Sequence, residues 1–66
     1  MILTVNGNPR ELADGATVAE LLAALNLAER LVAVEVNLEV VPRARHGEHR
    51  LAEGDRVEIV TLVGGG

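Results

Sequence analysis

The sequence contains no cysteine, phenylalanine, tyrosine or tryptophan, and all six of its basic residues are arginine. Without cysteine the chain has no disulfide, thiolate zinc site, persulfide or thiol nucleophile. Without aromatic rings it has no side chains on which single-stranded bases could stack. Its formal net charge of −4 also opposes binding to phosphate backbones and anionic lipids. We therefore expect neither a nucleic-acid partner nor a membrane partner.

Long apolar runs are missing as well. Every unbroken apolar run is far shorter than the about 20 residues that a membrane-spanning helix needs. The segment Met1–Val5 leads directly into Asn6-Gly7, without the basic region and long apolar region of a signal peptide. These features predict a soluble, cytoplasmic protein. A length of 66 residues allows one small domain with little room for a deep catalytic cleft.

Local patterns predict one helix among five strands. Apolar residues at positions 18, 21, 22 and 25 form one helical stripe. Thr17 and Glu20 have the spacing of a capping box at its start, and Asn26 is suited to end it in a left-handed conformation. The expected strands are apolar or β-branched segments bounded by turn residues: Met1–Val5, Arg10–Leu12, Leu31–Val36, Val40–Val41 and Arg56–Leu62.

This order of elements is the outline of a β-grasp fold. The predicted class is α+β, with a mixed four- to five-stranded sheet and one main helix packed across one face. The first and last strands are expected side by side in the middle, because the shorter strands suit the edges. Val60 and Leu62 would then point to the uncovered face. The residues expected to face the helix are Leu3, Val5, Val57 and Ile59. We assign residues 1–63 to the β-grasp domain and 64–66 to a flexible glycine tail.

The terminal Gly64-Gly65-Gly66 is the main candidate for chemistry. Glycines have no side chain to pack and lose more entropy on ordering than any other residue. A glycine tail suits threading into a narrow slot on another protein, where the α-carboxylate of Gly66 is unhindered. ATP could activate that carboxylate as an acyl-adenylate. The alternative is a floppy end, because glycine-rich ends are common as flexible linkers. The β-grasp outline favours the first interpretation.

Several stretches taken in order resemble the ThiS family of thiamine-biosynthesis sulfur carriers, within the ubiquitin-like β-grasp superfamily. The resemblance covers nearly the whole chain. It departs at Leu38, where a small or polar turn residue is expected, and over residues 46–50. The similar stretches are Ile2–Gly7, Thr17–Leu22, Val32–Asn37, Val40–Arg43, Gly54–Val60 and Val63–Gly66.

The resemblance implies a protein co-substrate rather than an enzyme, with no catalytic residue of its own. An E1-like adenylating enzyme, ThiF-like, would use ATP and magnesium to adenylate Gly66, and the chain itself would bind no cofactor. A cysteine desulfurase route would supply sulfur for a thiocarboxylate on Gly66. A ThiG-like thiazole synthase would use that sulfur to build the thiazole ring of thiamine. Gly64 and Gly65 would thread the tail.

Apolar side chains beside the tail are candidates for partner docking. Val60, Leu62 and Val63 lie where any enzyme acting on Gly66 must hold the domain. Other functions remain open at this point. The chain could be a related β-grasp sulfur carrier for molybdopterin or tRNA thiolation. It could also be a ubiquitin-like modifier that joins Gly66 to a lysine, or a small binding module with an inert tail.

Two polar clusters carry weaker signals. His46 and His49 are spaced i, i+3, but two imidazoles without a third firm ligand are a weak metal site. We interpret their segment, which contains Gly47, as a solvated loop and assign no metal ligands. We interpret three nearby arginines, Arg43, Arg45 and Arg50, as ordinary surface charges. The alternative is a docking patch for an acidic partner.

Overall fold

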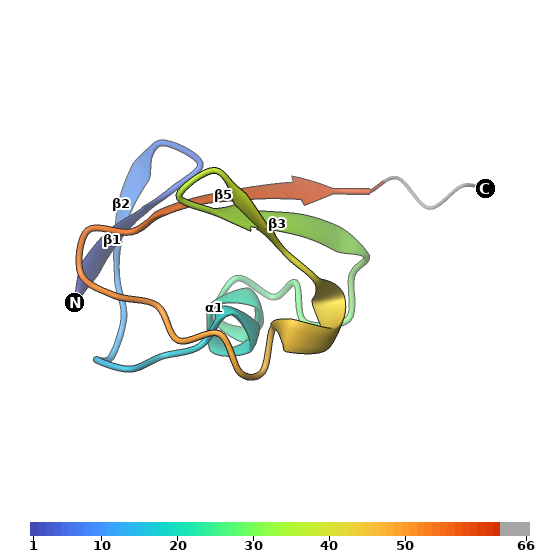
Figure 1. The fold of residues 1–66 in the computed structure, drawn as a ribbon, viewed down its shortest axis with the longest axis horizontal. Helices are drawn as coiled ribbons and strands as arrows, with labels where there is room; N and C mark the ends of the chain where they lie inside the picture. The colour runs from blue at the N-terminus through green and yellow to red at the C-terminus, as the bar shows by residue number, and fades with distance from the viewer. Residues whose placement is uncertain (63–66) are drawn as a thin grey trace.

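The computed structural model describes residues 1–62 and shows a five-stranded mixed sheet crossed by one α-helix (Figure 1). The strand order is β2-β1-β5-β3-β4, with β1 parallel to β5 and every other neighbouring pair antiparallel. The elements are β1 (Ile2–Val5), β2 (Asn8–Glu11), α1 (Val18–Ala24), β3 (Val32–Val36), β4 (Glu39–Val41), the 3₁₀ helix η1 (Arg43–Arg45) and β5 (Arg56–Thr61). The predicted mixed sheet with one main helix is confirmed.

The centre of the sheet is also as predicted, since the first and last strands lie side by side. β5 is the central strand, and the short strands β2 and β4 form the edges. Side chains of β5 alternate between buried and exposed over its first four residues, as the period of two in a strand requires. The predicted core residues Leu3, Val5, Val57 and Ile59 are all buried. The helix covers this face with Val18, Leu21 and Leu22.

The ends of α1 follow the local sequence signals. Thr17 Oγ1 accepts a hydrogen bond from the Glu20 amide at 3.2 Å, and Glu20 Oε1 accepts one from the Thr17 amide at 3.0 Å. This reciprocal pair is the predicted capping box. Asn26 has a φ of 60°, so the predicted left-handed residue after the helix is also confirmed.

Both hairpin turns consist of two residues. Val5 pairs with Asn8, so the first turn is Asn6-Gly7, and β2 begins two residues before the expected strand Arg10–Leu12. The second turn consists of Asn37 and Leu38, with φ values of 52° and 71°. A leucine with positive φ is uncommon, and the unusual residue noted at this turn therefore stands in an unusual backbone conformation.

The interpretation of residues 43–50 as a solvated loop is wrong in two respects. Arg43–Arg45 form a turn of 3₁₀ helix, and His46 is buried, with 7% of its surface exposed. Its Nε2 donates to the Val41 carbonyl at 3.0 Å, and its own carbonyl accepts from the Ala19 amide at 2.9 Å. The imidazole therefore joins the segment to β4, while its backbone joins it to α1.

Residues 63–66 lie outside the described part, and so does the predicted domain boundary after residue 63. Over residues 1–62, no helix has the length and hydrophobicity needed to span a membrane. Within the same residues, no three His, Asp or Glu side chains are grouped so that they could hold a metal ion.

Candidate functional site

The candidate site begins where β5 extends past α1 at one end of the fold (Figure 1). Val60 is 60% exposed and Leu62 is 47% exposed. These two of the three predicted docking residues are therefore available to a partner at the point where the chain leaves the sheet. Val63 and the predicted functional glycines Gly64, Gly65 and Gly66 lie outside the described residues.

The sheet face opposite α1 extends this apolar surface. Val60 pairs with Ala33 of β3, and Glu35 pairs with Val40 of β4. Val40 is 69% exposed, so it joins Val60 as uncovered apolar surface. Sequence reasoning did not single out Val40, although its position next to Val41, which is buried, follows from strand alternation. We call Ala33, Glu35, Val40, Glu58 and Val60 the open face.

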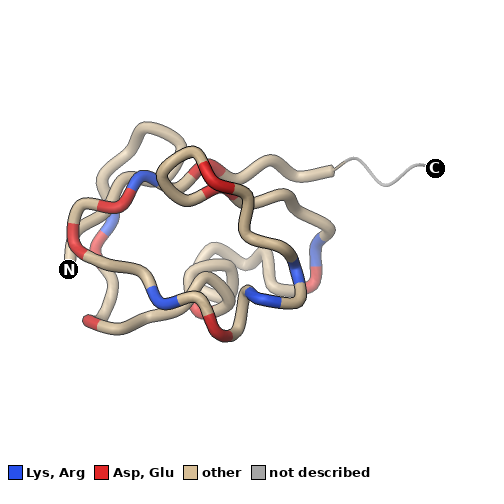
Figure 2. The backbone as a smooth tube through the Cα atoms, viewed as in Figure 1, with Lys and Arg blue, Asp and Glu red and all other residues tan. Residues whose placement is uncertain are grey.

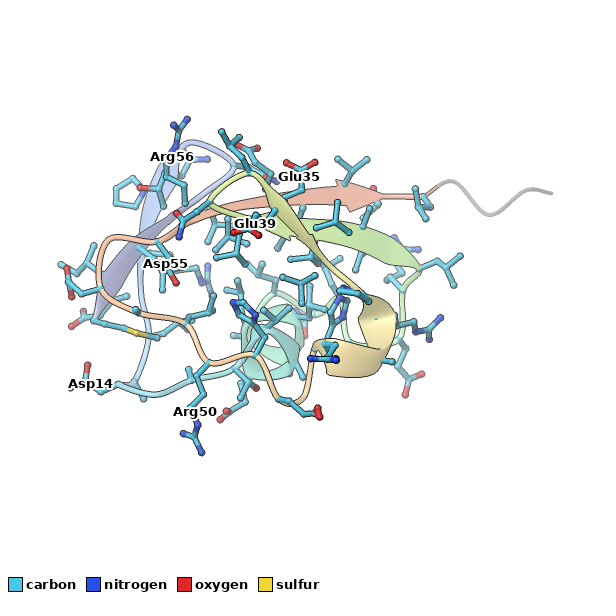
Figure 3. The ribbon with its side chains drawn as sticks, in the orientation of Figure 1. Asp14, Glu35, Glu39, Arg50, Asp55 and Arg56 are labelled. Atoms are coloured by element: carbon cyan, nitrogen blue, oxygen red, sulfur yellow. The ribbon has the colours of Figure 1, made fainter. Side chains whose placement is uncertain are left out.

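Two carboxylates interrupt the open face. Glu35 of β3 lies directly opposite Glu58 of β5 in the antiparallel register. Like charges at directly opposed positions destabilise a sheet. Figure 2 shows acidic positions on the sheet side of the molecule, and Figure 3 shows Glu35 on the side of the sheet away from α1. The open face therefore combines apolar and negatively charged groups, which suits a partner surface with apolar and basic groups.

The predicted arginine cluster lies in residues 43–50, after β4. Arg43, Arg45 and Arg50 are exposed, and Arg50 Nη1 donates to the Gly15 carbonyl at 3.3 Å. Figure 3 places Arg50 on the α1 side of the sheet, opposite Glu35. The structure thus does not bring Arg50 together with the exposed apolar end of β5. The alternative of an acidic partner for these arginines stays a prediction.

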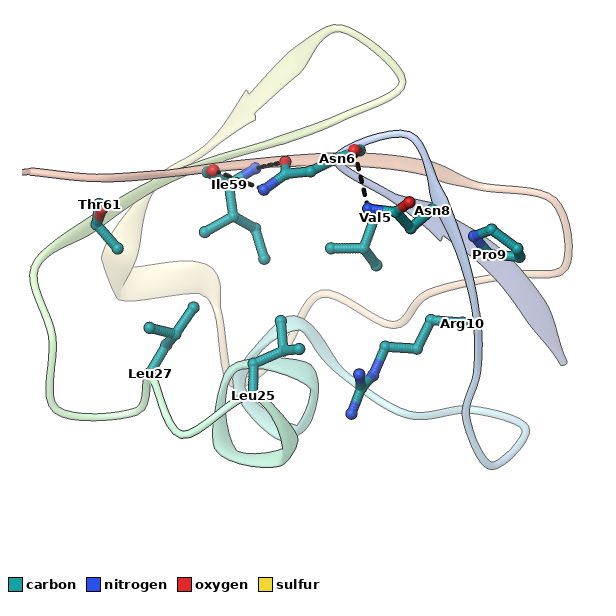
Figure 4. A pocket seen from close by; sticks show the side chains of 9 residues that line it. All are labelled: Val5, Asn6, Asn8, Pro9, Arg10, Leu25, Leu27, Ile59 and Thr61. Carbon is teal, nitrogen blue, oxygen red and sulfur yellow. Dashed lines mark hydrogen bonds between the residues drawn. The ribbon is translucent and has the colours of Figure 1, made fainter.

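A cavity of about 380 Å³ lies between the sheet and the C-terminal end of α1 (Figure 4). Its lining includes no carboxylate, histidine or thiol, so it offers neither a general base nor a set of metal ligands. Asn6 and Thr61 contribute polar groups, and Ile59 contributes part of the apolar wall. The cavity was not predicted, because it forms where segments distant in the sequence come together.

One ionisable group has a displaced pKa. The Met1 ammonium donates to the Asp14 carboxylate at 3.0 Å and to the Leu12 carbonyl at 2.8 Å. The hydrogen bond to Asp14 is the main reason that the pKa of the terminal amine is raised above its ordinary value. This contact lies at the start of β1 and involves none of the residues of the candidate site.

Comparison with known proteins links this geometry to one family. The ThiS family model matches residues 3–66. The sulfur carrier protein ThiS of Bacillus subtilis is 42% identical over 53 residues, which are 80% of this chain and 80% of that protein. The sulfur carrier protein ThiS of Escherichia coli is 30% identical over 66 residues, the full length of both chains.

Two longer relatives match this chain over only a fifth of their own length. The thiazole synthase of Paramagnetospirillum magneticum is 42% identical over 66 residues, which are all of this chain but 20% of that protein. The chain also matches 20% of the length of a second thiazole synthase, from Magnetococcus marinus, at 41% identity. In both proteins, therefore, a region similar to this chain is part of a chain about five times as long.

Solved structures agree with the family match. The crystal structure of a thiamine biosynthesis protein, ThiS, from Geobacter metallireducens superposes with a TM-score of 0.84 at 42% identity and covers the whole of both chains. SAMP1 from Haloferax volcanii has a TM-score of 0.63 at 20% identity and shows likeness of fold alone. The predicted β-grasp class is confirmed by these two likenesses together with the observed strand order.

Proposed function

Because the chain belongs to the ThiS family, which is a family of sulfur carriers and not of catalysts, we propose that Gly66 carries sulfur for the thiazole ring of thiamine. In the first step the Gly66 carboxylate attacks the α-phosphorus of ATP on an E1-like, ThiF-like enzyme, with magnesium on the phosphates. Pyrophosphate leaves and an acyl-adenylate forms. A persulfide from a cysteine desulfurase route then displaces AMP to form an acyl disulfide. A thiol such as cysteine cleaves its S–S bond, which leaves a thiocarboxylate on Gly66 and a disulfide on the former persulfide carrier.

The observation that carries this proposal is the family match over residues 3–66, which includes all three tail glycines. Composition supports it, because a chain without cysteine needs another attachment point for sulfur. Adenylation has a chemical reason. A terminal carboxylate is ionised near neutral pH, and it resists nucleophiles until one of its oxygens becomes part of a good leaving group.

We propose that the open face and the end of β5 hold the partner while Gly64 and Gly65 thread the tail into its active site. The exposure of Val60, Leu62 and Val40 supports this assignment for the described residues. Val63, the third predicted docking residue, lies outside them. The partners are the adenylating enzyme and a ThiG-like thiazole synthase. The likeness of this chain to part of two thiazole synthases supports the second partner.

Intact-mass spectrometry tests the proposal. The chain is incubated with ATP, magnesium, an E1-like adenylating enzyme, a cysteine desulfurase and cysteine. We expect an ATP-dependent gain that corresponds to one oxygen replaced by sulfur, located in the C-terminal peptide. A variant that lacks Gly65 and Gly66 is the control and should show no gain. Absence of the gain with an enzyme that loads a known carrier would refute the Gly66 mechanism for that enzyme.

The fate of the loaded chain separates the acceptors. Consumption of the thiocarboxylate by thiazole synthase, with release of the unmodified chain, supports thiamine synthesis. A thiocarboxylate that thiazole synthase leaves intact would instead indicate a carrier for molybdopterin or tRNA thiolation. An amide bond between Gly66 and a lysine of another protein would indicate a modifier.

A further inference from the structure

The side chain of Asn6 forms hydrogen bonds with β5 at a point where β1 has already ended. The parallel pairing of β1 with β5 stops at Val5 and Val57, because the chain turns at Asn6 into β2. Two residues along β5, the Ile59 amide donates to Asn6 Oδ1 at 2.7 Å. The Asn6 Nδ2 amide donates to the Ile59 carbonyl at 3.1 Å (Figure 4). One side-chain amide therefore supplies the acceptor and the donor that a neighbouring strand would supply.

This contact holds the half of β5 that leads toward the tail. On its other edge, β5 stays paired with β3 up to Thr61, and the Leu62 amide donates to the Leu31 carbonyl at 2.9 Å. On the β1 edge, the last strand pair is Val5 with Val57. Within residues 1–62, the Asn6 amide is the contact that extends the hydrogen bonding of this edge to Ile59.

The backbone of Asn6 orients this side chain. Its φ is 50°, a left-handed conformation that asparagine tolerates better than most residues. Its own amide donates to the Val57 carbonyl at 2.9 Å. Because the main chain and the side chain of one residue both bond to β5, the amide is held in register with Ile59.

We propose that Asn6 is a positioning residue that fixes the direction of β5 beyond Ile59. It thereby sets how Val60, Leu62 and the glycine tail are presented to the adenylating enzyme. This inference rests on the proposed function for its effect on adenylation. The effect on the order of β5 is a property of the chain alone and is measured separately.

The chain offers a matched control in Asn37, which also lies in a two-residue hairpin turn, with a φ of 52°. Its Oδ1 accepts from the Arg56 amide at 2.9 Å, and its own amide donates to the Arg56 carbonyl at 2.7 Å. Both asparagines therefore bond to β5, but Asn37 does so at the first residue of the strand. Substitution by alanine at either position removes the side-chain hydrogen bonds and places at positive φ a residue that is less suited to it.

The first experiment compares Asn6→Ala with Asn37→Ala. Amide hydrogen exchange is measured at Ile59 and Leu62, together with the global stability from urea unfolding. For equal losses of global stability, we expect faster exchange at Ile59 and Leu62 in Asn6→Ala alone. With the adenylating enzyme, ATP–pyrophosphate exchange should show KM for Asn6→Ala raised by about tenfold, with kcat changed much less. Asn37→Ala should keep the KM of the original chain.

The second experiment uses the chemistry of the amide. In Asn6→Asp, an ionised carboxylate still accepts from the Ile59 amide but repels the Ile59 carbonyl, because it has no proton to donate. A protonated carboxyl offers one donor and one acceptor and so replaces the amide. We expect the Ile59 amide chemical shift of Asn6→Asp to return toward that of the original chain as the pH falls through the pKa of the new carboxyl.

Three results would overturn the inference. Equal changes in KM for Asn6→Ala and Asn37→Ala would show that Asn6 affects adenylation only through the general stability of the fold. Unchanged exchange at Ile59 in Asn6→Ala would show that β5 needs no support at this point. A chemical shift of the Ile59 amide in Asn6→Asp that does not change with pH would refute the proposed pair of hydrogen bonds. If the original chain is not adenylated at all, the proposed function fails, while the exchange data still decide whether Asn6 orders β5.

Discussion

The two faces of the sheet differ although the same strands build both. On the face under α1, Val57 and Ile59 are buried, whereas Glu58 and Val60 on the other face are exposed. The covered face holds a continuous apolar cluster that the helix completes. The open face presents apolar side chains together with two directly opposed carboxylates. The difference indicates that one face serves stability, while the other keeps features that stability alone would not favour.

The largest expected effect is on the covered face. Leu21 is completely buried, so Leu21→Ala removes apolar contacts and leaves a cavity. We expect a loss of about 2–5 kcal/mol in the free energy of unfolding, measured by urea denaturation. The control is the same substitution at Leu38, which is 79% exposed and should change stability by less than about 0.5 kcal/mol. Equal losses at the two positions would contradict the expectation that burial under α1 determines how much a leucine contributes to stability.

The helix that covers this face depends on its cap. Thr17→Ala removes the oxygen that accepts from the Glu20 amide. We expect a loss of about 1 kcal/mol in the free energy of unfolding, measured in the same way. Thr17→Ser keeps the accepting oxygen and should retain most of the stability. A Ser variant as unstable as the Ala variant would show that the cap contributes through packing rather than through its hydrogen bond.

On the open face, a mutation can increase stability. Glu35→Arg places a cation opposite Glu58 and replaces a repulsive pair by an attractive one. We expect a gain of about 0.2–1 kcal/mol in the free energy of unfolding, which should shrink at high salt because exposed charges are screened. The same variant should bind the adenylating enzyme more weakly if the partner presents basic groups. A gain that is independent of salt would argue against the electrostatic explanation.

Val60 is the residue of the open face that lies nearest the end of β5. Val60→Ser removes exposed apolar surface, so the free energy of unfolding should change by less than about 0.5 kcal/mol. We expect KM for adenylation to rise, since the side chain lies in the proposed docking surface. Ile2→Ser is the control, because Ile2 is 53% exposed at the start of β1, far along the sheet from the end of β5. Equal KM changes in both variants would remove the assignment of docking to Val60.

The smallest effect is expected from alkaline pH. The pKa of the Met1 amine is raised in the folded chain by its hydrogen bond to Asp14. The stabilisation is therefore complete below the unfolded pKa of about 8 and is lost as the pH rises through the folded pKa. The chain has no lysine, tyrosine or cysteine that would titrate in this range. We expect the thermal midpoint to fall slightly between neutral and alkaline pH, and Asp14→Asn should reduce this fall.

The asparagines and His46 show what sequence patterns could not predict. Asn26 was correctly expected in a left-handed conformation, because such a backbone is a local preference of asparagine. The bond from Asn6 to Ile59 spans 53 positions in the sequence, and no local pattern encodes that contact. His46 was expected in solvent because its neighbours are polar. Its burial depends on β4 and α1 meeting around it, and only the folded chain provides that surrounding.

The sequence by itself determined the elements, the helix cap, the core residues and the family, because each depends on short-range periodicity, local hydrogen bonding or similarity along the chain. Tertiary structure alone decided the strand register, the opposition of Glu35 to Glu58, the burial of His46 and the Asn6 contact with β5. These features join residues that are distant in the chain. Their energies depend on which groups the fold brings within hydrogen-bonding or packing distance, and that arrangement exists only once the sheet has formed.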